Sequence, residues 1–107
     1  MYRVTTPTHT FTLPIETATC TEILVTYRQG KTIINKHYEN GTLPAGMTLD
    51  GKNVVIRLTQ EETKRFDGEE MAFVQIRVLT NAEDAFASQV FSVFINDVLN
   101  EEILTDE

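Results

Sequence analysis

Two stretches with an apolar residue at every second position constrain the fold of this chain most strongly. In residues 53–58 and 70–80 every second position is apolar, and these positions hold Val54, Ile56, Leu58, Ala72, Val74, Ile76 and Val78. Successive side chains of a strand point to opposite faces, so a period of two predicts a strand with one buried face. Both stretches are therefore predicted to be strands that contribute these residues to the core.

The segment between these strands predicts a short helical turn over residues 59–66. Thr59 is followed three residues later by Glu62, and this spacing is typical of a capping box, in which each side chain accepts a hydrogen bond from the other residue's backbone N–H. Glycine tolerates the left-handed conformation that closes many helices, so Gly68 is expected to end the turn. The two strands are then expected to lie in different sheets, joined by this corner.

A further strand, residues 85–95, is expected to return beside residues 70–80 after a turn at residues 81–84. With Thr80 opposite Ala85, the register places one apolar set on the core face and a second on the outer face. The outer set comprises Met71, Phe73, Leu79, Phe86, Val90 and Phe94. A contiguous exposed apolar face is uncommon on a soluble monomer, so these residues are predicted to contact another protein. Alternatively, a helix, the C-terminal tail or an extra strand of the same chain covers them.

The rest of the chain also indicates strands separated by turns, as in an all-β domain. These strands are predicted at residues 2–5, 9–13, 22–28 and 32–38. Residues 39–47 contain two glycines and a proline and are predicted to be a surface loop. About seven strands, with hairpins between the third and fourth and between the sixth and seventh, predict an immunoglobulin-like two-sheet Greek-key sandwich. The first, second and fifth strands are assigned to one sheet and the others to the second sheet.

The length and charge of the chain limit its organisation and its partners. Its 107 residues fit one domain, predicted as residues 1–96, followed by an acidic C-terminal tail, residues 97–107. The net charge is −7, and the tail contributes Asp97, Glu101, Glu102, Asp106 and Glu107 without a Lys or Arg. General nucleic-acid binding requires a basic face, so no nucleic-acid partner is expected. The tail is expected to dock as a short helix or strand, or to become ordered on a partner, and to add little stability.

Residues that commonly carry catalysis or bind metals are few and scattered. His9 and His37 fall in different predicted strands without Asp or Glu at ligand spacing, so no metal site is expected. The adjacent acids at 61–62 and 69–70 point in different directions, which does not suit a catalytic pair of carboxylates. The serines of the predicted outer face have no histidine nearby, so no hydrolase triad is indicated. The chain is predicted not to be an enzyme and to need no cofactor.

Cysteine use and hydropathy bear on the cellular setting. Cys20 is the only cysteine, so the fold does not depend on an intrachain disulfide. No apolar run is long enough to cross a bilayer, and the N-terminus lacks the apolar segment of a signal peptide. Synthesis in the cytoplasm and no membrane contact are expected.

Five segments distributed along the chain carry a resemblance, namely residues 6–11 (TPTHTF), 23–30 (ILVTYRQG), 58–63 (LTQEET), 75–80 (QIRVLT) and 98–102 (VLNEE). They resemble segments of small proteins encoded in tailed phages and prophages of gut Firmicutes. The resemblance implies a non-enzymatic structural protein of the virion, near the tail or baseplate, with an immunoglobulin-like fold. Its partner would be another copy of itself or another virion component, and its location the bacterial cytoplasm during synthesis and then the virion. The resemblance carries no functional residues with it.

Two other functions are alternatives to assembly. An immunoglobulin-like module can bind a glycan or a host surface, but the aromatic clusters on loops that this function favours are not evident in the sequence. An acidic protein can also mimic nucleic acid, but the acids here are concentrated in the tail and do not line a long face. Protein–protein contact through the outer face of residues 70–95 is the leading hypothesis.

Overall fold

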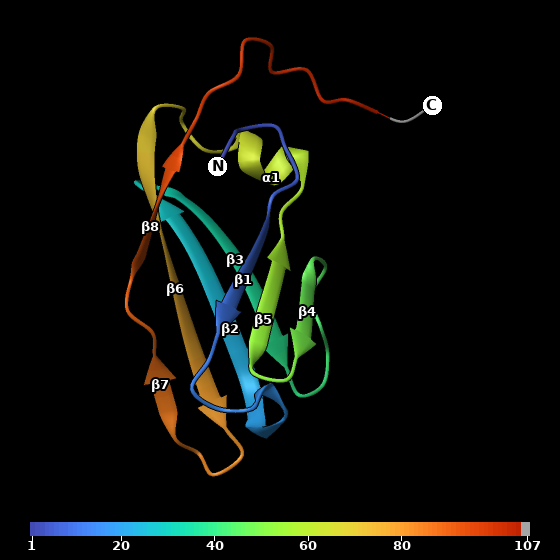
Figure 1. Cartoon of the computed structure of the whole chain (residues 1–107), viewed down its shortest axis with the longest axis vertical. Coiled ribbons are helices and arrows are strands. Elements are labelled where there is room, and N and C mark those ends of the chain that lie inside the picture. The colour runs from blue at the N-terminus through green and yellow to red at the C-terminus, as the bar shows by residue number, and fades with distance from the viewer. Residues whose placement is uncertain (106–107) are drawn as a thin grey trace.

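The computed structural model describes residues 1–105, which form two antiparallel sheets packed face to face (Figure 1). The three-stranded sheet has the order β1 (Thr8–Thr12), β5 (Asn53–Arg57), β4 (Met47–Asp50). The five-stranded sheet has the order β3 (Thr32–Glu39), β2 (Cys20–Gln29), β6 (Glu70–Thr80), β7 (Ala85–Ala87), with β8 (Phe91–Ile95) also paired to β6. Helix α1 (Gln60–Lys64) and the 3-10 turn η1 (Thr17–Thr19) lie in the connections.

The connections follow the Greek-key rule that was predicted. The hairpins β2–β3, β4–β5 and β6–β7 each stay within one sheet, while the links from β1 to β2, from β3 to β4 and from β5 to β6 cross between the sheets. Helix α1 lies in the last of these crossings, where the corner was expected (Figure 1). The prediction of an all-β, immunoglobulin-like two-sheet sandwich is therefore confirmed.

Two local assignments were wrong. Residues 2–5 form no strand, because Val4 has a positive φ of 57° that interrupts the extended chain. Tyr2 forms a single parallel bridge with Asn96, so the start of the chain lies beside the large sheet. Strand β4 was not predicted, and its first residue, Met47, was assigned to the surface loop. A strand of four residues is too short to show a clear alternation of apolar and polar positions in the sequence.

The inward-facing residues expected from the alternating stretches do form the core. The buried apolar side chains of β5 and β6 and the residue after β5 are Val54, Ile56, Leu58, Ala72, Val74, Ile76 and Val78. Strand β2 adds Ile23, Val25 and Tyr27, and Phe66, which follows α1, is only 1% exposed. Burial of each large side chain contributes about 1.5–3 kcal/mol, so contacts between the two sheets hold the sandwich together.

The capping box at α1 is present as predicted. The Glu62 N–H donates to Thr59 Oγ1 at 3.1 Å, and the Thr59 N–H donates to Glu62 Oε1 at 2.9 Å. The end of the corner differs from the expectation, because the left-handed residue is Glu69 (φ 61°) and Gly68 does not have a positive φ. Glycine at position 68 instead leaves room for the side chain of Asp97, with which an added Cβ would collide.

Replacing Thr59 with alanine is expected to lower the free energy of unfolding by about 1 kcal/mol, because the Glu62 N–H loses its partner. Urea denaturation measures this change. Thr6→Ala is the control, since Thr6 is exposed and its side chain makes no hydrogen bond within the described chain. Equal losses in both variants would show that the cap contributes nothing.

Residues 97–105 of the C-terminal tail lie across the end of the sandwich, next to α1 (Figure 1). Arg3 Nη1 donates to Asp97 Oδ1 at 2.7 Å and also to the carboxylate of Glu101. Further along the tail, Gln60 Nε2 donates to Leu104 O and the Leu104 N–H donates to Gln60 Oε1, each at 2.9 Å. The described tail residues therefore contact the domain without forming a helix or strand. Asp106 and Glu107 of the predicted tail lie outside the described residues.

Candidate functional site

Four exposed apolar side chains gather on the outer face of the large sheet, at the end near α1. Met71 and Phe73 come from β6, Phe94 from β8 and Val90 from the β7–β8 link, and each is between 42% and 56% exposed. Met71 lies directly opposite Phe94, and Phe73 lies opposite Ser92, as predicted. Val90 and Phe73 line the same shallow hollow. These four residues are called the outer patch below.

The outer patch continues toward β3 through residues that the sequence interpretation did not include. Arg28 of β2 lies opposite Phe73, and Ile33 of β3 lies opposite Arg28 and is exposed. Thr26, Gln75 and Val90 complete the hollow beside Arg28 and Phe73. Ile33 was missed because Ile33 and Ile34 are adjacent, so the sequence does not say which of them faces outward.

Leu79 and Phe86, the other two predicted contact residues, do not join the outer patch. The Thr80 N–H donates to Asp84 O at 2.9 Å, which leaves a loop of residues 81–83 in place of the expected longer turn. Glu83 takes the left-handed conformation (φ 64°) that such three-residue loops require, and no glycine in the sequence indicates it. The register of β7 therefore shifts by one residue relative to the prediction.

The shift moves Phe86 to the other side of the sheet. Phe86 lies opposite Val78 instead of Leu79, and it lines an apolar cavity of about 280 Å³ together with Leu13 and Ile15. Leu79 remains on the outer face but is only partly exposed. Of the six residues predicted to contact another protein, four thus lie together in the outer patch, Leu79 is only partly exposed, and Phe86 lies on the opposite side of the sheet.

An irregularity between β7 and β8 restores the predicted register for β8. Ala87 pairs with Arg77 and Phe91 pairs with Val74, so one extra residue is accommodated in the outer strand. Ser88 fixes this bulge, because its N–H donates to Ile76 O at 2.8 Å and its hydroxyl accepts from the Ile76 N–H at 3.0 Å. The bulge returns Val90 to the outer face and completes the outer patch.

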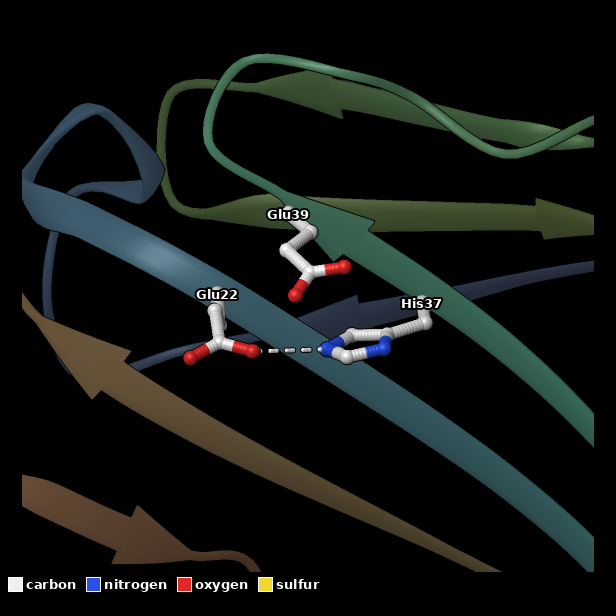
Figure 2. Close-up of side chains that lie close together, drawn as sticks. All are labelled: Glu22, His37 and Glu39. Carbon is white, nitrogen blue, oxygen red and sulfur yellow. Dashed lines mark hydrogen bonds and ion pairs between the residues drawn. The ribbon is translucent and has the colours of Figure 1, made fainter.

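A second cluster, formed by Glu22, His37 and Glu39, lies on the neighbouring strands β2 and β3 (Figure 2). His37 Nε2 lies 3.0 Å from Glu22 Oε1, and the ligand atoms of all three residues lie within 4.8 Å of one another. Glu22 and Glu39 face each other directly across the hairpin. We call these residues the β2–β3 cluster. The expectation of no metal site considered each histidine alone and did not align the two strands of this hairpin.

The polar side chains inside the sandwich have structural partners. His9 Nδ1 lies 2.7 Å from Tyr27 Oη, and burial lowers the pKa of His9 and raises that of Tyr27. Burial also raises the pKa of the Cys20 thiol, which disfavours the reactive thiolate. No buried side-chain nitrogen or oxygen in the described chain lacks a hydrogen-bond partner. These groups therefore stabilise the interior.

Comparisons of the chain with known protein families, with curated proteins and with solved structures give no match. No helix within residues 1–105 has the length and apolar character needed to span a membrane.

Proposed function

We propose that the protein is a non-catalytic assembly protein that acts through protein–protein contact at the outer patch. The observation that carries this proposal is the exposure of four large apolar side chains on one face of a sheet whose other face already supplies the core. Soluble monomers rarely leave such a contiguous apolar area in water, and interfaces concentrate aromatic residues and methionine.

The composition of the surrounding surface is also that of an interface. Phe73 and Phe94 are the aromatic residues of the outer patch, and Thr26, Arg28 and Gln75 supply hydrogen-bonding groups in the hollow beside Phe73. Full burial of a large apolar side chain contributes about 1.5–3 kcal/mol, and because these side chains are already about half buried, each adds about half of that before the cost of association is subtracted. This amount is enough to influence assembly.

A second copy of the chain is the partner that we propose for the outer patch. An apolar patch is complementary to itself, so a two-fold symmetric contact can bury it on both copies at once. Face-to-face packing of two sheets is also the arrangement that the sandwich already uses internally.

We further propose that this assembly protein belongs to a tailed-phage or prophage virion and is made in the bacterial cytoplasm before it joins the particle. The resemblance of several sequence segments to small proteins of such phages supports this setting. Another virion component then becomes the alternative occupant of the outer patch.

Replacing Phe73 and Phe94 with glutamate in one variant is expected to convert self-associated wild-type protein into monomer, because two carboxylates would be desolvated at the contact. Sedimentation velocity over a range of concentrations measures the association. Circular dichroism and the melting midpoint should show a folded protein, since both side chains are exposed.

A matched control replaces Thr6 and Leu43 with glutamate. Both residues are exposed and lie away from the outer patch, so the control adds the same charge and should leave association unchanged. A wild-type protein that stays monomeric at all concentrations would refute self-association, and capture of a purified virion protein by the wild type alone would assign the outer patch to that protein. Unfolding of the Phe73 and Phe94 variant would show that these side chains are internal and that the surface does not exist.

The glycan-binding alternative gains no support from the position of the aromatic residues. The exposed phenylalanines, Phe73, Phe86 and Phe94, lie on the strands β6, β7 and β8. They are not gathered on the loops at one end of the sandwich.

A further inference from the structure

The β2–β3 hairpin brings two carboxylates into direct opposition. Glu22 pairs with Glu39, and the adjacent Asn40 N–H donates to Thr21 O at 2.9 Å. The Glu22–Glu39 pair is consequently of the type without mutual backbone hydrogen bonds, in which side chains come closest. His37, two residues before Glu39, projects from the same face of β3 (Figure 2).

The negative charges of this pair are not neutralised by a neighbouring base. Among the ion pairs of residues 1–105, neither Glu22 nor Glu39 contacts a Lys or Arg, and only His37 reaches Glu22. Arg77 lines the adjoining hollow but forms no ion pair with either carboxylate in the described chain. Like charges directly opposite each other destabilise a sheet, so the cluster favours the arrival of a cation.

We propose that Glu22, His37 and Glu39 form a binding site for a zinc-like divalent cation. One imidazole nitrogen and two carboxylate oxygens are ligands that zinc binds at about 2.0–2.2 Å, and tetrahedral geometry then places ligand atoms about 3.3 Å apart. His37 Nε2 and Glu22 Oε1 are already 3.0 Å apart. The exposed side chain of Glu39 completes the set by a small rotation, since all three ligand atoms lie within 4.8 Å.

The ligand set also determines the class of metal. Imidazole suits zinc, nickel and copper, whereas magnesium and calcium prefer sites made of oxygen alone. Three protein ligands leave one position of a tetrahedral ion open to water or to a donor atom of another molecule. The bound ion would join the edge strand β3 to β2 and neutralise the Glu22–Glu39 pair.

Isothermal titration of the metal-free 107-residue chain with zinc chloride tests this site. We expect one bound zinc ion per chain, and His37→Gln and Glu39→Gln are each expected to weaken binding by at least about tenfold. Titration with magnesium chloride should give no comparable binding. Zinc should also raise the melting midpoint of the wild type, with little effect on His37→Gln, because only the folded hairpin assembles the ligands.

His9→Gln is the matched control, since His9 is the other of the two histidines and lies against Tyr27 on a different part of the sandwich. Zinc affinity should be unchanged in this variant and in the Phe73→Glu, Phe94→Glu double variant, so the site can be tested apart from self-association. Equal zinc affinity of the wild type and His37→Gln, or loss of binding in His9→Gln, would overturn the proposal. Circular dichroism of each variant establishes that a loss of binding is not a loss of fold.

Discussion

Replacing Gly46 with alanine is expected to lower the free energy of unfolding by at least about 3 kcal/mol. Gly46 has a φ of +84°, which strains any residue with a Cβ, and an added Cβ would also overlap the carbonyl oxygen of Arg57. The two backbones cannot easily separate, because the Arg57 N–H donates to Gly46 O at 2.7 Å. Strain and overlap therefore add, and urea denaturation measures their sum.

Gly41→Ala separates these two causes. Gly41 has nearly the same φ, +85°, but an added Cβ would meet nothing within 4 Å. Only the conformational cost should remain, and we expect a loss of about 1–2 kcal/mol. If the two variants lose the same stability, the close approach of Gly46 to β5 is absent in solution.

Replacing Lys36 with methionine is expected to lower the free energy of unfolding by about 2–3 kcal/mol. Lys36 Nζ lies 2.7 Å from Glu62 Oε2, and the two side chains are only 10% and 13% exposed. Removal of one partner from a fully buried pair costs about 3–5 kcal/mol, and the residual exposure of this pair reduces that value. Lys31→Met, at the exposed turn between β2 and β3, is the control and should cause little loss.

Acid is expected to reduce the difference between the wild type and Lys36→Met. Burial alone would raise the pKa of Glu62, but hydrogen bonds from Lys36 and Thr59 outweigh it and hold the pKa below its ordinary value of 4.5. A carboxyl group of this kind stabilises the folded state above its ordinary pKa, and the contribution is lost as the pH falls through the lower folded value. Urea denaturation at neutral pH and below about pH 4 measures the convergence. A constant difference across this range would show that the Glu62 charge does not contribute.

The general architecture could be predicted because alternation and capping are local properties. The inward set of β6 needs only the order of its own residues, and the capping box needs only Thr59 and Glu62. The register of β7 depends instead on the backbone conformation of Glu83, a residue type that rarely takes a positive φ. A single unrecognised residue therefore moved Phe86 away from the outer face, while the bulge at Ser88 preserved the prediction for Phe94.

The β2–β3 cluster and the Lys36–Glu62 pair each bring together residues that are far apart in the sequence, so neither can be predicted from local patterns alone. The turn at Gly30 and Lys31 sets the register that places Glu22 opposite Glu39, so the β2–β3 cluster could have been found by aligning the hairpin from this turn. The Lys36–Glu62 pair joins β3 to α1 across a change of sheet. No alternation or spacing in the sequence indicates that the inward-facing Lys36 will contact Glu62 of α1.

The position of Lys36 has a consequence for how copies of the protein can aggregate. Strand β3 is one edge of the large sheet, and a charged side chain directed inward from an edge strand disfavours the addition of a further strand. The opposite edge is interrupted by the bulge between β7 and β8, which also disfavours continuous pairing. Neither edge is thus suited to template a growing fibril, and copies that meet face to face would form closed pairs that stop growing once their apolar surfaces are covered.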